Sequence, residues 1–126
     1  MHDFDDSSLT RQVIGFAIEV HRQLGPGLLE SAYEECLCFE FDQAGVAYVR
    51  QQKLPLRYKG IELDCRYQID LVIENSLIVE VKAVNQISPI HEAQLHTYLR
   101  LSGLRLGLLL NFNCAMLKDG IKRRRL

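Results

Sequence analysis

The chain has 126 residues, of which 48% are hydrophobic and 25% are charged, and its formal net charge is −1. This length predicts a single domain over residues 1–126, because two independent cores need a longer chain. No apolar run approaches the ~20 residues that cross a bilayer, and the acidic segment 1–6 does not resemble a signal peptide. We therefore expect a cytoplasmic protein without a membrane partner.

The first third of the chain predicts two helices. Ser7 and Ser8 can cap a helix that ends near Leu24, because the glycine–proline–glycine segment at residues 25–27 stops it. The apolar stripe of this helix recurs at helical spacing and consists of Val13, Ile14, Ala17, Ile18, His21 and Leu24. A second helix is expected from about residue 28 to residue 44, with one face formed by Leu29, Tyr33, Leu37 and Phe41.

The pattern then changes to the alternation of strands. Residues 46–58 are extended but interrupted by Pro55, which indicates an edge strand or a bulge. A turn follows at Lys59 and Gly60. Residues 61–73 alternate, with one predicted face formed by Cys65, Tyr67, Ile69, Leu71 and Ile73, and the other by Arg66, Gln68, Asp70 and Val72.

The remaining elements complete an α/β pattern. Residues 74–76 predict a tight turn, and residues 77–83 predict a strongly apolar strand. A third helix is expected between Ser88 and Gly103, with a proline at its first position. Two more strands are expected, at residues 105–111 and 121–126. This order predicts an α/β domain with a mixed central sheet, built from an antiparallel meander and a crossover helix and flanked by helices.

The strand at residues 77–83 carries two ionisable side chains on one face. Period-two alternation puts Glu80 and Lys82 together with Ile78, while the other face is apolar. Charged groups in a central strand cost several kcal/mol unless they are paired or bind a metal. A structural Glu–Lys pair near the strand end is the simpler alternative. Asp70 in the preceding strand weighs against it, because it lies at a similar distance from the connecting turn.

The length of that turn decides whether Asp70 meets Glu80, because opposed residues of a hairpin share a face. A two-residue loop, residues 75–76, would pair Leu71 with Glu80. A three-residue loop, residues 74–76, or a bulge makes Asp70 oppose Glu80, and we predict this register. Two carboxylates beside a lysine could hold Mg²⁺ or Mn²⁺, which generates a nucleophilic water and offsets the charge on a phosphodiester.

These motifs resemble those of a known superfamily. Asp70 followed by residues 80–82 (Glu-Val-Lys) resembles the PD-(D/E)xK nuclease motif, with isoleucine in place of the proline. Gln94 and Tyr98 are four residues apart and share a helical face, and they resemble the Gln-x-x-x-Tyr motif of RecB-like members. Residues 27–33 (Gly-Leu-Leu-Glu-Ser-Ala-Tyr) are similar to the signature of the bacterial GxxExxY proteins, a branch of the same superfamily.

The resemblance implies a restriction-endonuclease-like core and a metal-dependent nuclease that acts on DNA in preference to RNA. It implies three carboxylates and one carbonyl as ligands of Mg²⁺ or Mn²⁺, from Glu30, Asp70, Glu80 and Val81. Lys82 can orient or deprotonate the attacking water and stabilise developing negative charge. Gln94 would position Lys82 or that water, and Tyr98 would contact a phosphate or shape the pocket.

Several of these positions also have simpler interpretations. Glu30 is a first-turn acid, which the helix dipole favours. Tyr33 is more consistent with the core than with a site, and Gly27 with a backbone requirement.

The basic end of the chain is the last candidate. Lys122, Arg123 and Arg124 could grip nucleic-acid phosphates, and a solvated terminal strand explains them equally well. Because 126 residues leave little beyond the core to embrace a duplex, a homodimer or a protein partner is expected to help. The alternative function is a catalytically silent nuclease-like module that binds nucleic acid or a protein.

Overall fold

The computed structural model describes residues 6–126, without the side chains of residues 6, 7, 65 and 66. Within this range the strands form one five-stranded mixed sheet in the order β1-β2-β3-β4-β5. The strands are β1 (Tyr48–Tyr58), β2 (Ile61–Ile73), β3 (Leu77–Lys82), β4 (Leu106–Asn111) and β5 (Ile121–Arg125). The first three strands form an antiparallel meander, and β4 lies parallel to β3 and antiparallel to β5.

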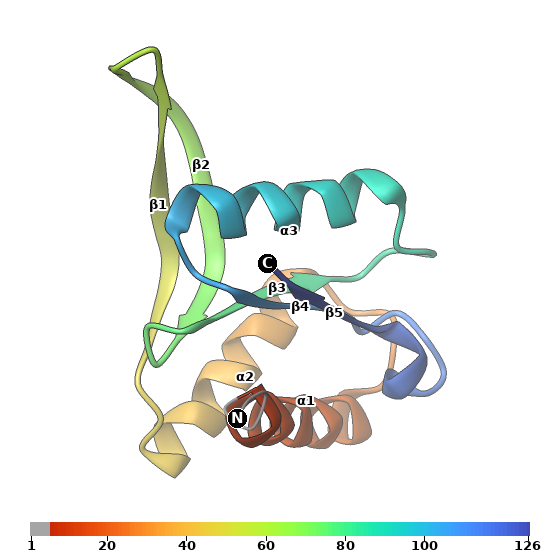
Figure 1. Cartoon of the computed structure of the whole chain (residues 1–126). Helices are drawn as coiled ribbons and strands as arrows, with labels where there is room; N and C mark the ends of the chain where they lie inside the picture. Colours follow the sequence, from red (N-terminus) through yellow and green to blue (C-terminus); the bar gives the residue numbers. More distant parts are fainter. Residues whose placement is uncertain (1–5) are drawn as a thin grey trace.

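Helices cover both faces of the sheet (Figure 1). Two of them, α1 (Arg11–Leu24) and α2 (Glu30–Ala44), lie on one face, and α3 (Pro89–Ser102) crosses the other face and connects β3 to β4. Parallel neighbours need such a crossover connection. One apolar cluster packs between the sheet and α1 and α2, and a second packs under α3. The predicted α/β fold, with its meander, crossover helix and flanking helices, is confirmed.

The start of α1 differs from the prediction. A π-helical turn, Asp6–Thr10, precedes α1, so Ser8 lies inside the helical segment instead of capping it. The side chain of Ser7 lies outside the described residues. Ile18 and Leu24 were predicted in the apolar stripe but are exposed. The buried face of α1 is narrower than predicted and consists of Val13, Ala17, Val20 and His21.

Tyr33 ties the loop between α1 and α2 to the core. Its ring is fully buried and stacks on Phe112 with 4.5 Å between the ring centroids. Its hydroxyl donates to the carbonyl oxygen of Gly25 at 2.6 Å and accepts from the N–H of Leu28 at 3.1 Å. The predicted core position of Tyr33 is therefore confirmed. Leu29 was predicted on the same buried face but is 76% exposed, because it precedes the first residue of α2.

Replacing Tyr33 with phenylalanine should keep the stacked ring and remove both hydrogen bonds. The Leu28 N–H and the Gly25 carbonyl would lose a part-buried partner, so we expect the free energy of unfolding to fall by about 1–3 kcal/mol. Urea denaturation measures this loss. Tyr58→Phe, at an exposed tyrosine of β1, is the control and should leave the stability unchanged. Equal stability of the two variants would contradict the expectation.

A three-residue loop, residues 74–76, joins β2 to β3 as predicted. Its first two residues have positive φ angles of 51° and 54°. Leu71 pairs with Val79, and the same register aligns Asp70 with Glu80. This aligned pair lies where the regular pairing of the two strands ends.

The first two strands form a long hairpin that projects beyond the rest of the sheet (Figure 1). The pairing of β1 with β2 shifts register between Leu54 and Leu56, so Pro55 marks the predicted bulge on an edge strand. The faces predicted for Cys65 and Arg66 concern side chains outside the described residues.

The hairpin changes face at Asp70, and the regular alternation predicted for residues 61–73 is wrong there. Leu71 packs in the cluster beside α1 and α2, whereas Ile69, two residues earlier, packs in the cluster under α3. Opposite Asp70, Gln51 of β1 has a positive φ of 54°, and the pairing of β1 with β2 passes from Arg50 and Leu71 directly to Gln52 and Ile69. This local twist shifts the phase of both strands by one residue and turns the hairpin toward α3.

Candidate active site

Glu80 is a charged residue in the interior of the sheet. Its side chain is only 3% exposed, and its Oε2 accepts a hydrogen bond from the N–H of Asp70 at 2.9 Å. Burial, followed by the negative charge of Asp70, raises the pKa of Glu80 from an ordinary 4.5 to about 8. A cation that binds beside such a carboxyl group stabilises its ionised form.

Asp70 lies opposite Glu80 on the neighbouring strand β2. Its Oδ2 accepts a hydrogen bond from the N–H of Val81 at 2.9 Å. Each carboxylate therefore accepts a hydrogen bond from the backbone of the other strand, in the opening where the β2–β3 ladder ends. Burial raises the pKa of Asp70, and the Val81 hydrogen bond opposes that rise. The structure thus brings the two acids together.

Lys82 is the last residue of β3 and is half-buried. Its positive charge partly offsets the raised pKa of both Asp70 and Glu80. The segment after it is held by β4, because the Asn111 side chain accepts from the N–H of Val84 at 3.0 Å and donates to its carbonyl at 2.9 Å. Asn111 was not predicted as part of the site, although its place as a polar residue at the end of an apolar strand indicated a specific role.

Two acids of α2 approach the same region. Glu30 is exposed, and its Oε2 accepts from the N–H of Ala83 at 3.3 Å, just beyond β3. Glu34, one helical turn later, is 6% exposed, and its negative charge contributes to the raised pKa of Asp70 and of Glu80. Glu34 was not predicted as a site residue. The spacing of four residues from Glu30 was a signal for it, because such residues share a helix face.

Arg50 and Gln51 of β1 surround the Glu34 carboxylate. Arg50 Nε donates to Glu34 Oε2 at 2.5 Å, and the guanidinium also pairs with Glu35. Gln51 Nε2 donates to both Glu34 oxygens at 3.2 and 3.1 Å and to Asp70 Oδ1 at 3.3 Å. Glu34 of α2 and Asp70 of β2 are therefore joined by one amide group.

The α3 side of the site is aromatic. Tyr98 is 5% exposed, and its ring lies edge-on to Tyr67 with 6.5 Å between centroids. Burial, and then the charges of Glu80 and Asp70, raise the pKa of Tyr98 to about 12. Gln94 is half-buried one turn earlier on α3, and among the described residues no hydrogen bond joins it to Lys82.

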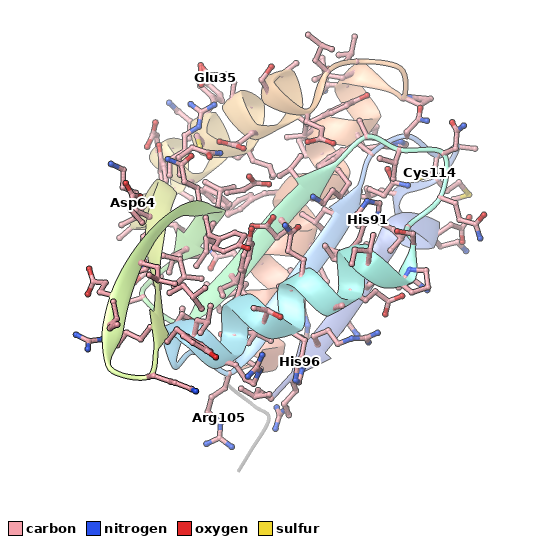
Figure 2. The ribbon with its side chains drawn as sticks, turned by 90° about the horizontal axis from the view of Figure 1, so that it is seen from above. Glu35, Asp64, His91, His96, Arg105 and Cys114 are labelled. Carbon is pink, nitrogen blue, oxygen red and sulfur yellow. The ribbon has the colours of Figure 1, made fainter. Side chains whose placement is uncertain are left out.

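The histidines of α3 lie along the helix, as the view onto it shows (Figure 2). We treat neither as a site residue. His91 Nδ1 accepts the N–H of Ser88 at 3.0 Å and completes the cap of the helix, while His96 is exposed.

The basic side chains of β5 divide between two faces of an edge strand. Lys122 and Arg124 oppose β4 residues on the α3 side, and Arg123 opposes one on the other side. Arg124 forms an ion pair with Glu92 of α3. The structure therefore does not gather Lys122, Arg123 and Arg124 into one patch.

The donor set of the site suits a hard cation. Within residues 6–126 and their described side chains, no three Asp, Glu, His or Cys side chains already form a metal-ligand group. Backbone N–H groups donate hydrogen bonds to Asp70, Glu80 and Glu30. The chemistry still fits, since two adjacent carboxylates with raised pKa present the oxygen ligands that Mg²⁺ and Mn²⁺ prefer.

A mixed sheet with helices on both faces, and paired carboxylates with a lysine on its second and third strands, defines a restriction-endonuclease-like α/β domain. A model of the PD-(D/E)XK nuclease superfamily matches residues 7–124, and the chain belongs to this superfamily. No curated protein and no solved structure matches the chain. Nucleases of this superfamily generally use divalent metal ions and act on nucleic acid.

The GxxExxY branch stays a prediction. Among the described helices, none has the length and apolar character needed to cross a membrane.

Proposed function

We propose that the protein is a Mg²⁺- or Mn²⁺-dependent nuclease that hydrolyses phosphodiester bonds in DNA, in preference to RNA. The observation that carries this proposal is the buried pair of carboxylates, Asp70 and Glu80, beside Lys82. Two ionised carboxylates in the interior of a sheet are costly because they lose hydration and repel each other. A bound cation offsets this cost. Membership of the nuclease superfamily supports the same conclusion.

Four groups would hold the ion, the carboxylates of Glu30, Asp70 and Glu80 and the carbonyl of Val81. The N–H of Val81 donates to Asp70, and the carbonyl of a strand residue projects to the same side as its N–H. The Val81 carbonyl is therefore directed into the opening that holds the acids. When bound, the ion would activate a water and offset the charge on a phosphodiester.

The remaining polar side chains would act on water and phosphate. Lys82 would orient or deprotonate the attacking water and stabilise developing negative charge. Gln94 would position Lys82 or that water, and Tyr98 would contact a phosphate or shape the pocket. More distant phosphates would meet the face of the basic edge strand that carries Lys122 and Arg124, while Arg123 lies on the opposite face.

We further propose that the chain acts as one cytoplasmic domain over residues 1–126. A pocket of about 690 Å³, lined by both strands of the hairpin, is one surface that nucleic acid could use. Its lining mixes Lys53 and Gln68 with Glu62 and Asp64, so its charge alone does not favour a polyanion. A second copy of the chain or a partner protein would supply the rest of the surface that binds nucleic acid.

The alternative is a catalytically silent nuclease-like module that binds nucleic acid or a protein. One observation favours it. Asp70 and Glu80 each accept a backbone hydrogen bond, so the pair is partly satisfied without a metal. Under this alternative nucleic acid binds but is not cut.

Cleavage of labelled DNA and RNA with Mg²⁺, Mn²⁺ or EDTA tests the proposal. The wild type should cut only with a metal, and Asp70→Ala and Lys82→Ala should each lower the rate at least ~100-fold. Binding without cleavage by all three proteins would support the silent module. Identical cleavage by all three would contradict the assigned residues.

A thermal-shift measurement tests metal binding independently of cleavage. Mn²⁺ should raise the melting temperature of the wild type but not of Asp70→Ala, because a ligand stabilises the folded state that binds it. Asp64→Ala removes an exposed acid of the same strand, visible on the hairpin in Figure 2, and should keep the full response.

A further inference from the structure

Gln51 has a backbone conformation that is unusual for a residue inside a β-strand. It lies inside β1, yet its φ is 54°, in the left-handed region that glutamine rarely adopts. The strand does not use a glycine here. Strained conformations of this kind persist when surrounding contacts hold them, and they cluster at functional sites.

Among the described residues, the hydrogen bonds that the Gln51 side chain donates go to acids of the candidate site. Its Nε2 donates to Glu34 Oε1 and Oε2 at 3.2 and 3.1 Å and to Asp70 Oδ1 at 3.3 Å. Glu34 comes from α2, and Asp70 comes from β2 at the point where that strand changes face. One carboxamide therefore links acids from two separate elements.

We propose that Gln51 is a positioning residue that holds the carboxylates of Glu34 and Asp70 side by side, so that the cation site is formed before the cation binds. This inference rests on the proposed metal-dependent function. The amide group suits this task because its N–H donors offset part of the repulsion between two carboxylates and add no charge. In this role Gln51 would act through these two carboxylates and would not itself bind the metal or the substrate.

The left-handed backbone is what brings the amide to this place. A regular strand residue at position 51 would continue the alternation and keep Asp70 in a ladder with β1. In the structure the ladder between β1 and β2 omits both Gln51 and Asp70. Asp70 is then free to turn its Oδ2 to the N–H of Val81 and its Oδ1 to Gln51. The strain at Gln51 and the orientation of Asp70 therefore have one cause.

Gln51→Gly separates positioning from folding. Glycine adopts a positive φ without strain, so this variant should melt no lower than Gln52→Gly, which places a glycine at the next residue of the same strand. Gln52 has no positive φ and is the matched control. Calorimetric titration with Mn²⁺ alone, without nucleic acid, measures the affinity of the site.

We expect Mn²⁺ to bind Gln51→Gly about tenfold more weakly than wild type, as is usual when a partner of a metal ligand is removed. Gln52→Gly should bind Mn²⁺ with wild-type affinity. In the cleavage assay at saturating Mn²⁺, Gln51→Gly should lose kcat with little change in KM, because a positioning residue would act on the carboxylates and not on the nucleic acid.

Three other outcomes count against the proposal. Equal Mn²⁺ affinity and kcat for Gln51→Gly and wild type would overturn the positioning inference and leave the nuclease function intact. An equal loss of affinity in both glycine variants would also overturn it, because the effect would then come from the strand backbone. A wild type that neither binds Mn²⁺ nor cuts would overturn the proposed function and this inference together.

Discussion

Glu80→Gln is expected to stop cleavage and at the same time to stabilise the metal-free protein at neutral pH. The loss of activity should reach at least ~10³-fold, about 4 kcal/mol of transition-state stabilisation, because the variant lacks one carboxylate of the pair. Glutamine keeps the size of the side chain and an oxygen that accepts the Asp70 N–H. What the substitution removes is the ability of this buried side chain to ionise.

The gain in stability follows from the raised pKa of Glu80. The folded protein holds this proton up to a pKa of about 8, while the unfolded chain releases it near 4.5. The folded state therefore binds more protons between these values, and the free energy of unfolding falls as the pH rises from 4.5 to 8. The cost at and above pH 8 is roughly 3–5 kcal/mol, since one pKa unit corresponds to about 1.4 kcal/mol.

Urea denaturation between pH 5 and pH 9 measures this slope. The wild type should lose stability as the pH rises, and Glu80→Gln should have a flatter profile. Glu62→Gln, at an exposed acid of the hairpin, is the control and should follow the wild type. Superimposable profiles for Glu80→Gln and wild type would show that the buried carboxyl group carries no such cost.

Metal binding should depend on pH for the same reason. Below pH 8 a cation must displace the Glu80 proton, so the affinity for Mn²⁺ should rise with pH up to about 8. This links the stability of the free protein to the chemistry of the site. The free energy that burial costs at Glu80 is available to bind a cation.

The meeting of Asp70 and Glu80 could be predicted because it depends on local features. The number of residues in the β2–β3 turn sets the register, and the register decides which side chains oppose one another. The helix order and the crossover helix likewise follow from hydrophobic periodicity. These parts of the fold can be predicted without knowing which other elements pack against them.

The acids and amides on the α2 side could not be predicted as a group, because they depend on tertiary packing. The position of Gln51 requires the hairpin to rotate so that Leu54 and Ile69 reach the cluster under α3. No glycine marks that rotation in the sequence. Glu34 had a signal in its spacing from Glu30, but which of the two is buried depends on where α2 meets the sheet.

Arg50→Met is expected to destabilise the protein by about 3 kcal/mol at neutral pH. Glu34 is 6% exposed and accepts a hydrogen bond from Arg50 Nε at 2.5 Å. Removing one partner of a buried pair leaves an uncompensated carboxylate, which typically costs 3–5 kcal/mol. The lower end applies because the Arg50 side chain is 36% exposed, so water screens part of its charge.

Arg57→Met is the matched control on the same strand. Its ion pair with Glu62 is exposed on both sides, so its loss should cost less than about 1 kcal/mol. The double variant Arg50→Met with Glu34→Gln should recover most of the stability, because the stranded charge is then absent. If Arg50→Met and Arg57→Met were equally stable, the Glu34 carboxylate would not depend on the guanidinium of Arg50 for its stability.

A cation in the site should compensate for the missing arginine. In Arg50→Met the Glu34 carboxylate is left beside Asp70 and Glu80, whose pKa values its charge already raises. The local negative charge is then larger, so Mn²⁺ should raise the melting temperature of Arg50→Met by more than that of the wild type. An equal shift in the two proteins would mean that Glu34 lies outside the influence of the ion, and Glu30 would then be the α2 acid that the site uses.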